Sequence, residues 1–350
     1  MKQLAIVGSF DDSNGKKSSY CQKLFNNIPD LTIINGGSYN DLEKILDSIN
    51  DYRVIYWFAN VPNDKEKLIN QIKVKNQECI LISSKNNLDN KYGFLELVSK
   101  ALFLKSNLFV VFTKNADNKF IAAVYDPLGN EFVSSDNIDD VRSALLNRVE
   151  QLLTYTRIPS VSIGTELEAH DEESFFAVAR RIAEKLFVSE KEINNTRFLG
   201  NLSFRCLNGF NSYKKDSLIY VSRRNIDKKN IDKNGFVPVQ KDSLNIVQYY
   251  GFKKPSVDTP IQLRLFNYYK NIKYIIHTHS YVKDAPFTKE IIPCGSIEEF
   301  DEIKYMFPDR ETCNFSVNLK GHGSIMFSDN VDYFETLDIM TRQLPEKKEK

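Results

Sequence analysis

The stretch KYIIHTHS at residues 273–280 places two of the chain's four histidines directly after an apolar, β-branched run. Such a run is typical of a buried strand. Because side chains alternate along a strand, residues two apart share a face, so His277 and His279 can reach one ion together. A third histidine, His322, follows in LKGHGSIMF at 319–327, where glycines would let the backbone come close to the site. The three imidazoles predict a metal site, since neutral imidazole binds zinc well and three protein ligands leave a position open.

Length and composition indicate a globular protein of two domains. The chain has 350 residues, of which 42% are hydrophobic and 27% charged. Its formal net charge of +1 gives no field that would attract nucleic acid or a membrane surface. No apolar run is long enough to cross a bilayer, and the N-terminal MKQLAIVGSF is typical of a first strand rather than a signal peptide. The five dispersed cysteines suit a reducing cytoplasm, which we expect to be the protein's location.

Residues 1–158 are predicted to form a Rossmann-like parallel α/β domain. Short apolar runs alternate with polar, helix-like segments, a pattern typical of a parallel sheet covered on both faces. The runs are LAIVGSF, LTIINGG, RVIYWFANV, ECILISS and NLFVVFT. A hairpin of FIAAVYD and EFVSS, a helix over 139–155 and a linker over 157–160 are expected to follow.

The role of this first domain stays open at the level of sequence. Ligands in open α/β sheets bind at the carboxyl ends of the strands, so Gly8, Ser9, Gly15 and Lys16 after the first strand could cradle a phosphate. The chain has neither GxGxxG nor GxxxxGK[ST] there, and an ordinary polar loop is the alternative. Binding of a nucleotide or sugar by this domain is therefore a hypothesis.

A second unit over residues 165–345 begins with an amphipathic helix. Its apolar face recurs with a period near 3.6 residues at Phe175, Val178, Ala179, Ile182, Leu186 and Phe187. Strands and turns follow from residue 196, with further helices over 258–269 and EEFDEIKYMF. NFSVNLKGHGSIMF is expected to be a strand pair, VDYFETLDIMTRQL a closing helix and PEKKEK a frayed tail.

Four stretches of this second unit, in order, resemble segments of the class II aldolase/adducin family. They are GNLSFR (200–205), KPSVDTPIQLRLF (254–266), YIIHTHSY (274–281) and LKGHGSIMF (319–327), and IIPCG (291–295) is also similar. The resemblance covers about residues 165–340 and implies an α/β/α domain with a mainly antiparallel central sheet. The first 160 residues resemble no family in this way.

The resemblance implies a metal-dependent lyase that acts on a small hydroxy-ketone, sugar or sugar phosphate. It further implies a divalent metal held by His277, His279 and His322, with zinc first and manganese, iron or cobalt as alternatives. A homo-oligomer, a tetramer in the family, is expected. Epimerase, dehydratase or decarboxylase chemistry and a non-catalytic, adducin-like binding module are the alternatives.

Asp258 stands where the family carries its acid/base, usually a longer Glu. A carboxylate near the metal could move a proton during bond cleavage. The alternative is that Asp258 caps the helix that follows it. Asn201, Ser203 and Ser256 occupy positions implied to contact phosphate or substrate oxygens, whereas ordinary turn chemistry is the alternative.

The chain departs from the family pattern at two places. Val257 replaces a frequent second serine, and Ser222-Arg223-Arg224 replaces a phosphate loop. Arginine can bind a phosphate or carboxylate bidentately, so Ser222 and Arg223 are candidate anion contacts; a solvated charged loop is the alternative.

Three further side chains have both a functional and a plain interpretation. Tyr281 could donate a proton or orient a substrate hydroxyl, or it could simply pack. Cys294 is either a neighbour of the metal ligands or a small buried hydrophobe. His170 is expected to be a surface or capping residue rather than a ligand.

Overall fold

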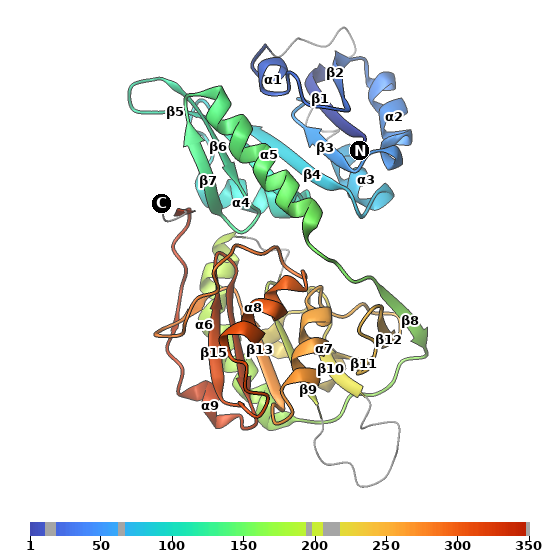
Figure 1. Cartoon of the computed structure of the whole chain (residues 1–350), viewed down its shortest axis with the longest axis vertical. Coiled ribbons are helices and arrows are strands. Elements are labelled where there is room, and N and C mark those ends of the chain that lie inside the picture. Colours follow the sequence, from blue (N-terminus) through green and yellow to red (C-terminus); the bar gives the residue numbers. More distant parts are fainter. Residues whose placement is uncertain (11–18, 62–66, 194–197, 206–217, 348–350) are drawn as a thin grey trace. The chain divides into compact units, whose positions relative to one another are not determined.

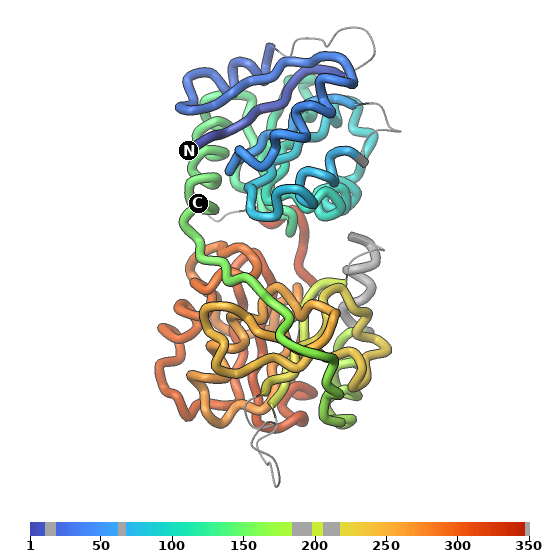
Figure 2. Tube along the Cα trace, turned by 90° about the vertical axis from the view of Figure 1, so that its right-hand side faces the viewer, coloured from blue at the N-terminus to red at the C-terminus, as the bar shows by residue number. Residues whose placement is uncertain are grey.

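The computed structural model describes residues 1–10, 19–61, 67–193, 198–205 and 218–347. The chain divides into two compact units, drawn from blue to red in Figures 1 and 2. One comprises Met1–Thr154 with the segment Leu344–Lys350, and the other comprises Tyr155–Gln343. The division falls close to the linker predicted over 157–160. Within the described residues, no helix is long and apolar enough to cross a bilayer.

The first unit is built on an eight-stranded sheet in the order β18-β7-β6-β5-β4-β3-β1-β2. Strands β1 to β5 run parallel, and β6 and β7 continue the sheet as an antiparallel hairpin. The strands are β1 (Gln3–Phe10), β2 (Leu31–Gly37), β3 (Val54–Trp57), β4 (Ile80–Asn86), β5 (Leu108–Lys114), β6 (Phe120–Tyr125) and β7 (Asn130–Ser135). The predicted Rossmann-like parallel sheet is confirmed.

Helices cover both faces of this sheet (Figure 1). One buried cluster joins α1 (Ser19–Leu24) and α5 (Ile138–Thr154) to the strands, through side chains such as Leu24 and Leu145. A second cluster joins α2 (Tyr39–Asp47) and α3 (Lys67–Lys75) to the opposite face. Helix α4 (Phe94–Phe103) connects β4 to β5. The strands β1 and β3 are apolar on both faces because helices cover both sides of them. The strand β2 is only partly buried.

The second unit has its own eight-stranded sheet, in the order β15-β16-β13-β9-β10-β11-β12-β8. All neighbours are antiparallel except β12 and β8. The strands are β8 (Ser160–Gly164), β9 (Asn201–Arg205), β10 (Leu218–Ser222), β11 (Phe236–Gln240), β12 (Val247–Tyr250), β13 (Tyr274–Thr278), β15 (Phe315–Leu319) and β16 (Gly323–Ser328). The expected mainly antiparallel sheet is confirmed.

Two layers of helices enclose the second sheet. Helices α7 (Thr259–Tyr268) and α8 (Glu298–Met306) pack on one face, through Ile261 and Ile303 among others. Helix α6 (Glu173–Ile193) packs on the other face through Phe175, Phe176 and Val178. The amphipathic pattern of this helix is observed as far as Ile182; the side chains of Leu186 and Phe187 lie outside the described part.

Two sequence predictions near the C-terminus are wrong. The predicted closing helix is limited to α9 (Asp332–Glu335), after which β17 (Ile339–Met340) pairs with β14 (Tyr281–Val282). The tail expected to fray instead contributes β18 (Glu346–Lys347), which pairs in parallel with β7. Both segments gain backbone hydrogen bonds from distant strands, which local periodicity does not reveal.

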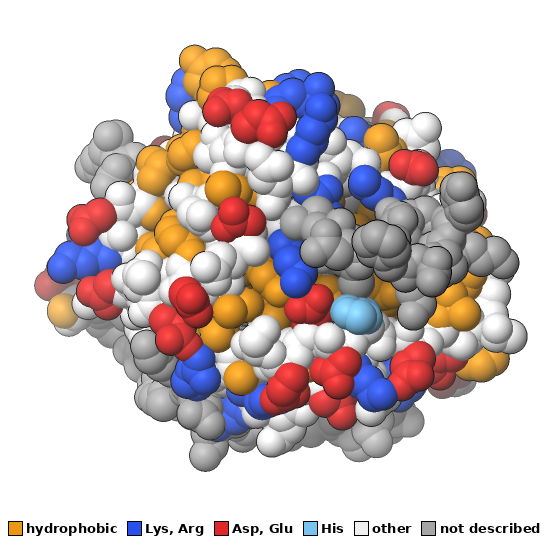
Figure 3. All heavy atoms as spheres, turned by 90° about the horizontal axis from the view of Figure 1, so that it is seen from below, with side chains coloured by type: hydrophobic (Ala, Val, Ile, Leu, Met, Phe, Trp, Pro, Cys, Tyr) orange, Lys and Arg blue, Asp and Glu red, His pale blue; other side chains and the backbone are white. Residues whose placement is uncertain are grey.

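Charged side chains of both signs are interspersed on the face of the protein shown in Figure 3. Basic residues on this face lie among acidic ones rather than forming an extended patch. The charge pattern is that of an ordinary solvated surface.

Candidate metal centre

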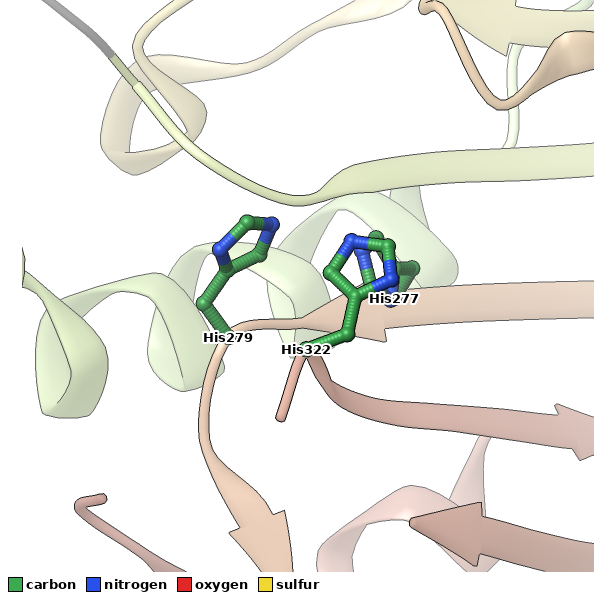
Figure 4. Close-up of side chains that lie close together, drawn as sticks. All are labelled: His277, His279 and His322. Atoms are coloured by element: carbon green, nitrogen blue, oxygen red, sulfur yellow. The ribbon is translucent and has the colours of Figure 1, made fainter. Parts of the chain in front are cut away.

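Three histidines come together at one end of strand β13 (Figure 4). His277 lies within β13, His279 follows its last residue, and His322 lies in the turn between β15 and β16. One ligand atom of each imidazole lies within 4.8 Å of the others. Nitrogens on one tetrahedral zinc are about 3.4 Å apart, since each Zn–N bond is about 2.0–2.1 Å. Modest rotations of the rings would therefore bring all three onto one ion.

Glycine allows the third histidine to reach this strand. Gly323 has φ +135°, and a Cβ atom added there would lie 2.0 Å from the carbonyl oxygen of Thr278 and 2.5 Å from the Cα of His279. No other residue fits at such a close approach of two backbones. The expectation that glycine brings the backbone close to the site is confirmed.

Hydrogen bonds fix the orientation of two of the rings. His277 Nδ1 lies 2.9 Å from the carbonyl oxygen of Ser324, which can only accept, so Nδ1 carries the proton and Nε2 keeps its lone pair. His322 Nδ1 bonds to the carboxylate of Glu299. Such a carboxylate or carbonyl partner is the usual support of a metal-binding histidine.

The site is buried, and burial controls its ionisation. Desolvation lowers the pKa of His277 to about 4 and that of His279 well below its ordinary value, and the neighbouring His322 acts in the same direction. Burial, reinforced by the Asp258 charge, raises the pKa of Glu299 well above its ordinary range. The imidazoles of His277 and His279 are thus held neutral, the form that binds a metal.

Two imidazole nitrogens of the triad are buried without a hydrogen-bond partner among the described residues: His277 Nε2 and His279 Nδ1. An unsatisfied buried nitrogen costs free energy of about 1–3 kcal/mol. A cation with open coordination positions would satisfy both, so these residues fit a divalent metal.

Asp258 lies next to the histidines. It holds the N-cap position of α7, but its side chain makes no capping hydrogen bond. Its Oδ2 lies 4.0 Å from His277 Nε2 and accepts a 2.6 Å hydrogen bond from Asn201 Nδ2. Its Oδ1 is buried with no partner, and the residue is 8% exposed.

Asn201 holds Asp258 rather than offering a free donor to a substrate. Its Nδ2 bonds to Asp258, and its Oδ1 accepts from Nε2 of the fully buried Gln262. The chain Gln262–Asn201–Asp258 fixes one carboxylate oxygen and leaves the other available.

Three serines proposed from sequence lie in different surroundings. Ser203 and Ser222 are buried in the sheet, and Ser222 Oγ accepts from the backbone N–H of Leu202 at 3.1 Å. The structure does not support a substrate contact for either residue. Ser256 lies at the start of the α7 turn, where its Oγ accepts from the Asp258 N–H at 3.4 Å.

Arg223 and Tyr281 also have structural partners. Arg223 Nη2 lies 2.5 Å from a carboxylate oxygen of Glu166. Tyr281 accepts at its hydroxyl from the backbone N–H of Gly321 at 3.0 Å, and its ring packs at 4.8 Å from Phe287. Through Gly321, Tyr281 supports the turn that carries His322.

Three neighbours of the triad matter more than sequence reasoning indicated. Glu299 and Gln262 were missed, because an acidic residue near a helix start and a glutamine within a helix give no distinctive signal. Cys294 proves to be a neighbour of the ligands, with its Sγ 2.9 Å from His322 Nε2. His170 lies half-exposed near Glu172 and outside the histidine group, as predicted.

Residues 185–308 match the family described as Class II Aldolase and Adducin N-terminal domain. The resemblance of the C-terminal half to this family is thereby confirmed, and the N-terminal half matches no family model. No curated protein matches the chain.

Similar solved structures each cover about half of the chain. An L-fuculose 1-phosphate aldolase has 18% identity and a TM-score of 0.34, over 48% of this chain and 82% of its own. An aldolase II superfamily protein from Pseudomonas syringae has 12% identity and a TM-score of 0.30, over 47% and 70%. The DNA/pantothenate metabolism flavoprotein from Streptococcus pneumoniae has 15% identity and a TM-score of 0.33, over 44% and 99%.

Proposed function

We propose that the second unit is a metal-dependent lyase of the class II aldolase type, acting on a small hydroxy-ketone, sugar or sugar phosphate. The observation that carries this proposal is the position of the Asp258 carboxylate, 4.0 Å from the unpartnered Nε2 of His277 in a triad of histidines of which two are buried. A carboxylate and a metal triad are the two parts that carbon–carbon cleavage next to a carbonyl requires.

We propose zinc as the metal, held by His277, His279 and His322. Three neutral nitrogen donors in one buried place are typical of catalytic zinc; manganese, iron and cobalt are alternatives. When bound, the ion supplies Lewis acidity to a substrate carbonyl. Glu299 would accept the Nδ1–H of His322 and so leave the lone pair of Nε2 available to a metal.

Asp258 is proposed as the group that moves the proton. Its Oδ2 is occupied by Asn201, so Oδ1 is the oxygen free to accept a proton from a substrate hydroxyl. Asn201 and Gln262 act as positioning residues, because they hold the carboxylate and do not need to touch the substrate.

Arg223, Ser256 and Tyr281 have weaker support as substrate contacts. The Arg223 guanidinium is paired with the half-exposed Glu166, an ion pair that an incoming phosphate could exchange for its own oxygens. Ser256 lies two residues before Asp258. We propose that Asn201 orients Asp258 and does not donate a hydrogen bond to a substrate phosphate.

The other members of the family imply further features, which we propose for this chain. A homo-oligomer, tetrameric by resemblance, is expected and can be tested by light scattering. A cytoplasmic location is also proposed, because the five cysteines are odd in number and dispersed along the sequence.

Product analysis with purified, zinc-loaded protein tests the proposal. A panel of hydroxy-ketone and sugar phosphates is incubated with the wild type and with Asp258→Asn. Formation of two carbonyl fragments by the wild type alone supports the lyase. An isomeric product, loss of water or loss of CO₂ would instead indicate epimerase, dehydratase or decarboxylase chemistry, and zinc binding without turnover would favour a non-catalytic, adducin-like module.

A further inference from the structure

A large cavity lies in the first unit, and its lining includes none of the residues of the proposed lyase. Its volume is about 370 Å³, and it is lined mainly by residues of β3, β4, β5 and α4. The cavities lined by His277, by contrast, have volumes of about 10 and 20 Å³. Sites for small molecules have volumes of about 300–1,000 Å³, so the first unit has room for a ligand of that kind.

The position of this cavity follows from the strand order. The order β2-β1-β3-β4-β5 is a doubly wound arrangement, in which ligands bind outside the carboxyl ends of the strands. Several of the strand residues that line the cavity lie at or near those ends: Trp57 in β3, Ser84 to Asn86 in β4 and Phe112 in β5. The lining continues along the strands to Ser83 in β4 and Phe109 near the start of β5. Asn60, which follows β3, also lines it and bridges to Ser9 near the end of β1.

The charge of the lining is positive. Lys85 and Lys100 contribute ammonium groups, and the described lining includes no Asp or Glu. Lys85 Nζ lies 4.8 Å and Lys100 Nζ 4.4 Å from the ring centroid of Tyr92, so the two cations are at most 4.8 plus 4.4, or 9.2 Å, apart. One aromatic ring thus holds two cations near each other, where an anionic group can meet both.

The lining also offers flat apolar surface and an unused donor. Trp57 is 2% exposed and lines the cavity, and its indole Nε1–H is buried with no hydrogen-bond partner. Phe58 and Phe112 add aromatic faces to the same wall. A buried tryptophan normally finds a partner for its N–H, so an acceptor supplied by a ligand is a consistent explanation.

We propose that this cavity binds a small anionic ligand with a planar ring, the chemistry of a nucleoside phosphate. Lys85 and Lys100 contact the phosphate, and the aromatic wall with the Trp57 N–H contacts the ring. This site is independent of the lyase proposed for the second unit.

Trp57 provides the test, because it is the only tryptophan in the chain. The full-length protein is titrated with AMP, CMP, GMP and UMP and with the corresponding triphosphates, nucleosides and inorganic phosphate, while tryptophan fluorescence is recorded. We expect the tryptophan fluorescence to change in a saturable way with at least one nucleotide. The substitutions Lys85→Gln and Lys100→Gln should each weaken the binding of that nucleotide about tenfold, which is the effect of losing one charge-assisted hydrogen bond.

Two control variants make the result specific. Lys44→Gln changes an exposed lysine on α2 and should leave the affinity unchanged. His277→Ala with His279→Ala should remove the metal site and leave the fluorescence response intact, which separates this proposal from the proposed lyase.

Four outcomes would overturn the proposal. They are no fluorescence change with any nucleotide at millimolar concentration, unchanged affinity in the double lysine variant, nucleosides that bind as tightly as nucleotides, or inorganic phosphate that binds as tightly as nucleotides. Equal binding of nucleosides would show that the anionic group is not recognised. Equal binding of inorganic phosphate would show that the planar ring is not recognised.

Discussion

Replacing Glu299 with alanine should weaken zinc binding by about 10–100-fold, the usual effect of losing a supporting carboxylate. Glu299 is 3% exposed, and its carboxylate bonds to His322 Nδ1. Without it the imidazole loses the partner that fixes its proton on Nδ1, and the buried N–H would cost about 1–3 kcal/mol. A 10–100-fold change corresponds to about 1.4–2.7 kcal/mol, which lies within that range.

Competition with a chromophoric zinc chelator measures the Kd of the wild type and of each variant. Glu299→Gln keeps the shape and an acceptor oxygen, so its loss should be smaller than that of Glu299→Ala. Asp301→Asn is the matched control, because Asp301 lies exposed on the same helix α8 and should bind zinc as the wild type does. If folded Glu299→Ala binds zinc within about twofold of the wild type, the supporting role of Glu299 is refuted.

Three further predictions concern the same centre. Asp258→Asn should lower kcat by about 10²–10⁴-fold in the product assay while the zinc content stays at the wild-type level, since the carboxylate is proposed to move a proton rather than hold the metal; equal turnover would contradict that role. Gly323→Ala should destabilise the second unit by about 2–4 kcal/mol in denaturant unfolding, because its Cβ meets the backbone of Thr278 and His279 at a positive φ; Gly93→Ala, with nothing within 4 Å, should change stability little. Because burial lowers the pKa of His277 to about 4, this ligand stays neutral at pH 5.5, and the zinc Kd should rise less than about threefold from pH 7.0 to 5.5, whereas a ligand of pKa 6.5 would by itself weaken binding by about eightfold.

Much of the fold could be predicted from local patterns. The apolar runs of the first half correspond to β1 to β5, and α5 and α7 lie where periodicity placed them. Periodicity failed at the C-terminus, because β17 and β18 are defined by pairing with β14 and β7, which lie far away in the sequence. A strand of two residues is too short to show a recognisable pattern of hydrophobic residues in the sequence.

The site was predictable to the extent that its chemistry is rare in the chain. With four histidines in 350 residues, the HTHS pair and His322 were conspicuous, and strand alternation brought the first two together. Glu299 and Gln262 were not predictable, since acidic and amide residues are common on helices and only the packing of α7 and α8 brings these two inward. Ser203 and Ser222 were candidates on motif position alone, and both lie in strands whose residues are all buried.

Metal analysis of the purified protein tests the central claim most directly. Elemental analysis should find about one equivalent of zinc, or of manganese, iron or cobalt, per chain, because the three imidazoles form one site of a kind that holds a single ion. His277→Ala with His279→Ala should lose that metal and remain folded. Less than about a tenth of an equivalent in wild-type protein supplied with each of these metals, or full metal content in the double variant, would contradict the account.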